Sequence, residues 1–67
     1  MITIYDIKKV KKQNATIKFL VELRGLSTDS KPTTIENGIV ENGSSFLEID
    51  KGDLYLYDLV GQQWNKV

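Results

Sequence analysis

Four carboxylates in the second half of the chain are the side chains best suited to hold a cation or to transfer protons. Paired carboxylates bind hard cations and act as general acids or bases. Their spacing lacks the regular oxygen ligands and the closing glutamate of a calcium loop. We therefore interpret them as solvated turn residues and predict no metal-binding or catalytic residue. The four are Glu48, Asp50, Asp53 and Asp58.

The composition excludes several other kinds of chemistry. The 67 residues include no cysteine and no histidine. A disulfide scaffold, a Cys/His zinc site and any nucleophile or general base that needs histidine are therefore excluded. The sequence also has no glycine-rich phosphate loop and no nucleophile elbow. We expect a protein that is not an enzyme and that needs no cofactor.

Basic residues concentrate near the amino terminus. Residues 1–25 carry six basic and two acidic side chains, whereas residues 26–67 carry three and seven, so the net charge is zero. The cluster consists of Lys8, Lys9, Lys11 and Lys12. It could contact phosphates, with Tyr5 or Phe19 as a stacking surface. Because nucleic-acid-binding proteins usually have a stronger positive excess, we favour a solvated hairpin end, or attraction between the two halves of one chain or of neighbouring copies. Nucleic acid is not the expected partner.

Aromatic residues in the last third of the chain form a candidate interaction surface. Tyrosine and tryptophan often anchor protein interfaces, and they also suit a surface for a sugar. In so small a domain the same residues can instead form half of the core. Both interpretations stay open, and they are compatible if assembly completes the core. The residues are Phe46, Tyr55, Tyr57 and Trp64.

Alternating apolar and polar residues predict a half-buried strand over residues 16–24, which Gly25 ends. Residues 2–10 are ambiguous, because either a strand with a bulge near Tyr5 or a short amphipathic helix explains their apolar positions. We favour the strand, because residues 11–15 can close a hairpin onto the next strand.

Residues 25–45 are rich in turn-forming residues and predict a long surface connection, with a short extended piece at Ile39-Val40. Loops of this length in small domains are often functional. The connection is therefore a candidate contact region, although a plain crossover between two hairpins explains it equally well.

Residues 45–67 predict a three-stranded antiparallel meander with one aliphatic and one aromatic face. The turn at residues 50–53 suits a hairpin loop of even length, which keeps apolar residues opposite one another. The second turn, at residues 58–63, then places Tyr57 opposite Trp64. The predicted pairs of the first hairpin are Ile49 with Leu54, Leu47 with Leu56, Glu48 with Tyr55 and Phe46 with Tyr57.

These elements predict one small, mostly β domain over residues 1–67, with an antiparallel sheet. Its parts are a basic N-terminal hairpin (residues 1–24), the turn-rich connection (25–45) and the C-terminal meander (45–67). A domain of this size is only marginally stable alone, so we expect either a marginal monomer or, as the favoured case, a chain that gains stability by binding a protein partner or copies of itself. The longest apolar run has three residues, far below the roughly 20 that span a membrane, and the chain start does not look like a secretory signal.

The segment from Gly43 to Asp58, followed by Trp64 and a closing Lys66-Val67, resembles a recurring small module of tailed bacteriophages and prophages. In that module an aromatic residue, an acid, an Asp-Thr-Gly turn, an aromatic pair and a terminal tryptophan recur in this order. Lys51 stands where threonine is common. The resemblance covers roughly residues 25–67 and carries no catalytic residues.

The resemblance implies a protein made in the bacterial cytoplasm and encoded among head and tail genes. Our leading hypothesis is a non-enzymatic structural or interaction module, incorporated in the virion as a head or tail accessory. The alternative is an early phage regulator that binds a host protein or nucleic acid through the edge from Lys8 to Lys12. Carbohydrate recognition through Tyr55, Tyr57 and Trp64 is a third, weaker hypothesis.

Overall fold

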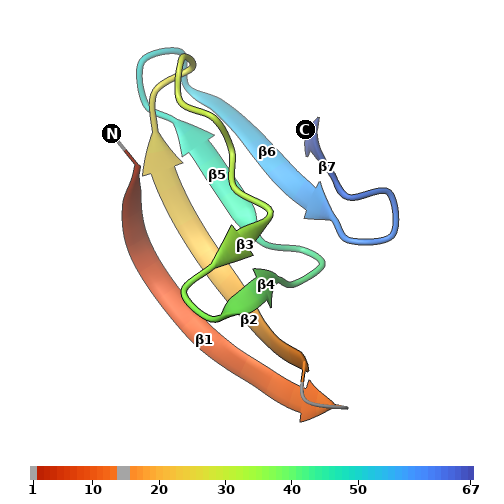
Figure 1. Cartoon of the computed structure of the whole chain (residues 1–67). Helices are drawn as coiled ribbons and strands as arrows, with labels where there is room; N and C mark the ends of the chain where they lie inside the picture. Colours follow the sequence, from red (N-terminus) through yellow and green to blue (C-terminus); the bar gives the residue numbers. More distant parts are fainter. Residues whose placement is uncertain (1, 14–15) are drawn as a thin grey trace.

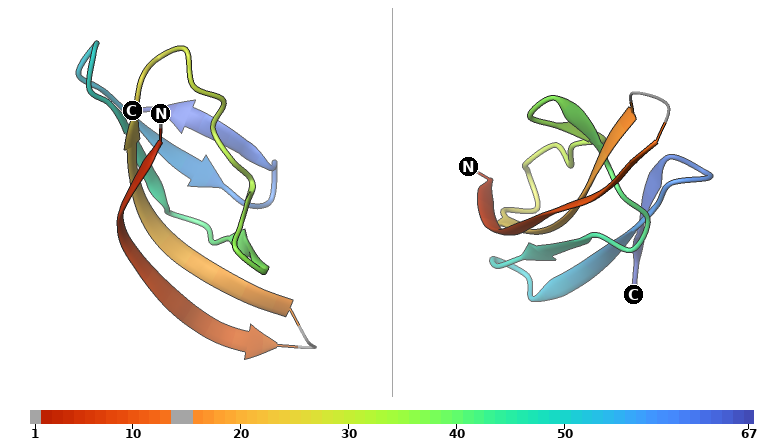
Figure 2. Two further views of the ribbon diagram at one scale, coloured as in Figure 1. Left: turned by 60° about the vertical axis from the view of Figure 1, so that its left-hand side comes forward. Right: turned by 90° about the horizontal axis from the view of Figure 1, so that it is seen from below.

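The computed structural model describes residues 2–13 and 16–67, and it describes only the backbone of residues 11–13. In this part of the chain seven strands form a single curled sheet (Figures 1 and 2), with the order β3-β4-β2-β5-β6-β7 and with β1 also paired to β2. The mostly β class predicted from the sequence is confirmed. The strands are β1 (Thr3–Gln13), β2 (Thr16–Gly25), β3 (Thr34–Ile35), β4 (Gly38–Val40), β5 (Ser45–Glu48), β6 (Asp53–Asp58) and β7 (Gln63–Lys66).

The first two strands form the long antiparallel hairpin that the sequence predicts. Ile4 pairs with Leu23, but Asp6 pairs with Glu22, so Tyr5 is an extra residue in β1. This one-residue shift is the predicted β-bulge, and it lets both Ile4 and Ile7 pair with core positions of β2. The helical alternative for residues 2–10 is therefore wrong. Residues 14 and 15 of the predicted hairpin loop lie outside the described residues.

β2 is the central strand, because it pairs with three other strands. β1 runs along one edge, and β4 and β5 follow one another along the other edge. Both β4 and β5 are parallel to β2, with Phe19 paired to Val40 and Leu23 paired to Phe46. The prediction of a wholly antiparallel sheet is therefore wrong at β2. The cause is the path of residues 26–33, which return from the end of β2 towards its start, so the chain runs along β2 a second time in the same direction (Figure 1).

The predicted connection over residues 25–45 thus contributes to the sheet. The extended piece expected at Ile39-Val40 is β4, and it pairs on its other side with β3. Gly38 runs so close to the backbone of Ile17 and the ring of Phe19 that a Cβ atom would overlap both. Glycine at this position therefore allows β4 to approach β2.

The C-terminal meander has the predicted strands, and the loop between β5 and β6 has an even number of residues, as predicted. The register of β5 against β6, however, differs from the predicted one by two residues. Phe46 pairs with Tyr55 and Leu47 with Leu54, so none of the four predicted pairs of this hairpin forms. The reason lies in the turn, where the Glu48 carbonyl accepts hydrogen bonds from the N–H groups of Lys51 and Gly52 at 3.2 and 2.7 Å and Gly52 has a φ of 70°, so the loop closes one residue earlier, over residues 49–52. A shift of two leaves every side chain on its predicted face. The second turn is as predicted, with Tyr57 opposite Trp64.

The core lies on the concave side of the sheet and contains the aromatic face of the meander. Phe46 and Tyr57 are buried against β2 and β4, and Trp64 contacts both rings, with centroid distances of 6.0 and 5.0 Å. The aliphatic face therefore lies outside. The buried apolar residues are Phe19, Val21, Leu23, Val40, Phe46 and Tyr57.

Ser44 joins β4 to β5 at the point where neither strand pairs with β2. Its side chain is fully buried, and its hydroxyl accepts a hydrogen bond from the Val21 N–H at 3.1 Å and donates one to the Glu41 carbonyl at 2.8 Å. The Glu41 N–H in turn donates to the Phe19 carbonyl at 2.8 Å. The hydroxyl therefore replaces a strand partner for the backbone of β2.

Replacement of this hydroxyl tests its role. We expect Ser44→Ala to lower the free energy of unfolding by about 1–3 kcal/mol, because the buried Val21 N–H would lose its acceptor. Ser45→Ala, at a half-buried position with no such contact to β2, should change the free energy by less than about 0.5 kcal/mol. Urea unfolding of the two variants measures the difference. Equal effects would contradict the assigned role.

Candidate interaction surface

The four aromatic residues proposed as an interaction surface line the interior of the protein. Phe46 and Tyr57 are 0% and 3% exposed, and Tyr55 and Trp64 are half-buried against the core. The Trp64 indole N–H donates to the Pro32 carbonyl at 2.9 Å. This bond fastens the last strand to the returning connection. The core interpretation therefore describes this face, and it leaves no open aromatic platform for a sugar.

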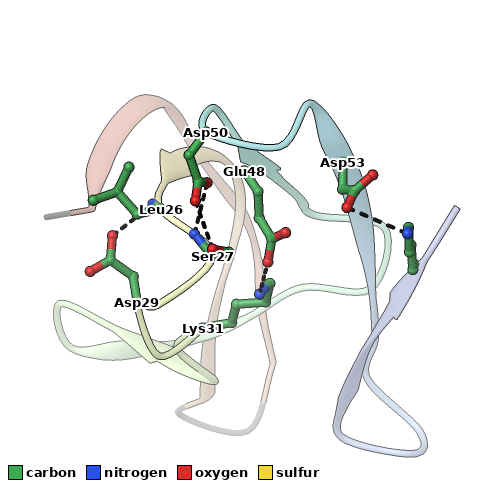
Figure 3. Close-up of polar contacts among 8 residues, drawn as sticks. Leu26, Ser27, Asp29, Lys31, Glu48, Asp50 and Asp53 are labelled. Atoms are coloured by element: carbon green, nitrogen blue, oxygen red, sulfur yellow. Dashed lines mark hydrogen bonds and ion pairs between the residues drawn. The ribbon is translucent and has the colours of Figure 1, made fainter.

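Lys31, which no sequence pattern singles out, covers the aromatic face. Its ammonium lies 2.7 Å from a carboxylate oxygen of Glu48 (Figure 3), and the two side chains are 16% and 4% exposed. The ammonium also lies 4.2 Å from the ring centroid of Tyr55 and 4.9 Å from that of Phe46. Aromatic faces attract cations, so two rings and one carboxylate compensate the buried charge. The interpretation of Glu48 as a solvated turn residue is therefore wrong.

The other three acids occupy separate turn contacts. Asp53 lies 3.4 Å from the ammonium of Lys66, and Asp58 accepts from the backbone N–H groups of Val60 and Gly61 at 3.1 and 3.2 Å. Asp50 binds Ser27. Among the described residues, no cluster of three potential ligands gathers that could hold a metal ion.

The Lys31–Glu48 pair should be much more important for stability than the exposed pair of Lys66 and Asp53. We expect Lys31→Met to lower the free energy of unfolding by about 3 kcal/mol, because it leaves a buried carboxylate unpaired. Lys66→Met should cost less than about 1 kcal/mol, because solvent screens that pair. Chemical unfolding monitored by Trp64 fluorescence gives both values.

The double variant Lys31→Met with Glu48→Leu keeps this test informative if the single variant does not fold. Because no lone charge remains inside, it should regain most of the lost stability. A double variant as unstable as Lys31→Met, or a Lys31→Met variant as stable as Lys66→Met, would contradict the role given to the pair.

Asp50 holds the start of the connection against the turn after β5, and Asp29 closes a turn within the connection. Asp50 accepts hydrogen bonds from the Ser27 hydroxyl at 2.7 Å and from the Ser27 N–H at 2.9 Å, and Asp29 accepts one from the Leu26 N–H at 2.8 Å (Figure 3). The Ser27 hydroxyl lowers the pKa of Asp50 below its ordinary value of 3.8. The Leu26 N–H likewise lowers the pKa of Asp29. Both carboxylates therefore stabilise the fold in their ionised form.

These lowered pKa values predict a loss of stability in acid. A carboxylate with a lower pKa in the folded state stabilises the protein above its unfolded pKa, near 3.8, and loses this effect as the pH falls through the folded pKa. Below about pH 4 the urea concentration at the midpoint of unfolding should therefore fall as the pH falls. We expect this fall to be less steep for Asp50→Asn than for the wild type, because the variant has no carboxylate to protonate at this position. Urea unfolding across this pH range gives the profiles, and parallel curves for wild type and Asp50→Asn would refute the assignment.

The outward face of the meander carries an apolar surface, which we call the outer aliphatic patch and define as Leu47, Leu54, Leu56 and Val67. Leu47 pairs with Leu54 across β5 and β6, and the Val67 N–H donates to the Leu54 carbonyl at 2.9 Å. Leu54, Leu56 and Val67 are 39%, 42% and 76% exposed, and Leu47 is half-buried. Ile49, at the adjoining turn, is 61% exposed. The predicted division of the meander into two faces thus leaves its aliphatic side in water.

A hollow of about 490 Å³ adjoins this patch. Its walls include Leu56, Asn65 and Val67 on one side and the turn at Asn42 and Gly43 on the other. Apart from Gly43 and its two chain neighbours, no heavy atom of the described residues lies within 4 Å of the place where a Cβ atom on Gly43 would stand. The outer face therefore combines protruding aliphatic side chains with a recess that a similar side chain can enter.

The basic cluster does not form one continuous charged face in its described part. Lys8 and Lys9 are exposed on the edge strand β1, opposite Leu20 and Phe19 respectively. Adjacent residues of a strand point to opposite faces. The side chains of Lys11 and Lys12 lie outside the described residues. Lysines and a bulge are typical protection of a sheet edge against unwanted pairing.

The two aromatic residues suggested as a stacking surface beside the lysines both contact other parts of the protein. Phe19 is a core residue with 8% exposure, so it offers no face to a base, and that suggestion is wrong. Tyr5 is exposed, but the guanidinium of Arg24 lies 3.7 Å from its ring centroid.

Comparisons of the chain with protein-family models, curated proteins and solved structures find no match. Within the described residues, no helix has the length and apolar character needed to cross a membrane.

Proposed function

We propose that this chain is a non-enzymatic phage or prophage protein that acts as a small structural module, packing its outer aliphatic patch against a virion protein or against its own copies. The observation that carries the proposal is the exposure of this patch on regular strands of the sheet. The resemblance of residues 43–58 to a module of tailed phages supports the phage origin.

The energetics favour burial of the patch by a protein. Leu54 and Leu56 each keep about two fifths of their surface in water, and Val67 keeps more. Removing such apolar surface from water contributes about 25 cal/mol per Å², or roughly 1 kcal/mol for each of these side chains. A small domain with limited core gains proportionally more from such contacts than a large one. A patch on regular strands also loses little conformational entropy on binding.

The regulator hypothesis receives less support. Lys8 and Lys9 lie on an edge strand and point to opposite faces, so they do not present a combined phosphate-binding surface. The net charge of zero also gives no general attraction to nucleic acid.

The proposal predicts that the protein is a component of purified particles and that the patch holds it there. Mass spectrometry of induced, gradient-purified particles should detect the wild-type chain. Leu54→Lys should remain in the lysate and be at least about tenfold depleted from particles, because a charge would replace an apolar contact.

Val60→Lys is the matched control. Val60 is 95% exposed in the turn between β6 and β7 and lies outside the patch, so this variant should be incorporated normally. Absence of the wild-type chain from particles, or equal incorporation of Leu54→Lys and Val60→Lys, would overturn the proposal.

A further inference from the structure

Two rows of side chains cross the outer face of β2, β5, β6 and β7. The strand registers and the hydrogen bond between Val67 and Leu54 define the rows. Each row begins on β2 with an exposed charged residue, and the two charges are opposite. The first row is Arg24, Leu47, Leu54 and Val67, and the second is Glu22, Ser45, Leu56 and Asn65.

We propose that a second copy of this chain covers the outer aliphatic patch, related to the first by a two-fold axis that runs across the strands between these two rows. This inference rests on the proposed function and names the partner of the same surface. The axis exchanges the rows, so Arg24 of each copy stands opposite Glu22 of the other. Leu54 stands opposite Leu56 of the other copy in the same way. A symmetric interface repeats every contact, so it contains two such ion pairs.

The other two-fold axis in the plane of the interface, parallel to the strands, gives a poorer match. It keeps each row opposite itself and reverses its direction. Arg24 would then face Val67 of the second copy, and Glu22 would face Asn65. Two charges would lose water without gaining a partner, which is unfavourable. Charge complementarity therefore selects the axis across the strands.

The hollow beside the patch fits the same arrangement. Leu56 and Asn65 line it, and both belong to the second row. The exchange of rows places Leu54 and Val67 of the second copy above them. Aliphatic side chains of one copy can therefore enter the recess of the other, as in sheets that pack face to face with nearly aligned strands.

The net charge of the chain and the area of the interface determine how tightly the two copies are expected to bind. The net charge is zero, so copies do not repel one another at long range. A stable interface usually buries about 800 Å² and 20–30 residues on each partner, whereas the two rows supply eight residues. We therefore expect a reversible dimer with a dissociation constant in roughly the micromolar range, which a high local concentration of copies would favour.

Reversing the charges of Arg24 and Glu22, singly and together, tests whether these residues face one another across the dimer interface. Sedimentation equilibrium from roughly 5 to 500 µM should show the wild-type chain passing from monomer to dimer. Arg24→Glu and Glu22→Arg should each weaken the dimer at least about tenfold, because like charges then face one another. The double variant, with both charges exchanged, should return to within about threefold of wild type.

Controls separate the interface from folding. Arg24 also contacts the Tyr5 ring, so urea unfolding of every variant should confirm an intact fold. Leu56→Lys should abolish the dimer, whereas Val60→Lys should leave it unchanged.

A wild-type chain that stays monomeric over this range, or a double variant no better than the single ones, would overturn the inference. Such a result leaves the detection of the protein in particles unaffected. Conversely, a dimer in solution together with absence from particles would overturn the proposed function alone.

Discussion

The buried contact between Lys31 and Glu48 is the constraint on which the rest of the structure depends. Both faces of the C-terminal meander are apolar enough to form a core, so its own sequence does not decide which side is inside. The ammonium of Lys31 reaches Glu48 and the rings of Phe46 and Tyr55 only from the concave side. When the connection that carries Lys31 lies on the concave side, it covers the aromatic face of the meander and shields it from water. A lone buried charge would be costly, so the lysine, the carboxylate and the rings have to assemble together.

The exposed aliphatic face follows from this choice. With the aromatic rings inside, Leu54 and Leu56 stay exposed, and no element of residues 2–13 and 16–67 covers them. The hydrogen bond from Trp64 to the Pro32 carbonyl directs the last strand towards the connection. The aromatic residues of the meander and the connection over residues 26–33 thus lie on one side of the sheet. On the other side the meander presents regular strands with exposed aliphatic side chains, which is the character of a surface that packs against another protein.

The sequence predicted most features that depend on neighbouring residues and missed those that depend on distant ones. Alternation over residues 16–24 and the extra residue at Tyr5 are local patterns, and both were predicted correctly. The parallel pairing of β2 with β4 and β5 was missed because alternation reveals neither strand direction nor the path of a distant segment. The register of the β5–β6 hairpin was wrong for a local reason, because the same alternation also fits a turn that closes on Glu48, whose carbonyl accepts from the Gly52 N–H at 2.7 Å. Lys31 was overlooked because a single lysine in a turn-rich segment usually lies in water.

The most direct test of the central claim is a solution NMR measurement of the Lys31 side chain. If Lys31 lies over the aromatic face, its ε-methylene protons should give nuclear Overhauser effects to the rings of Tyr55 and Phe46, and those rings should shift the methylene resonance upfield. The account also predicts contacts of Phe46 and Tyr57 with the Val21 methyl groups. A methylene resonance at its usual position without ring contacts, together with contacts between Val21 and Leu54, would show that the opposite face of the meander forms the core and would contradict the account.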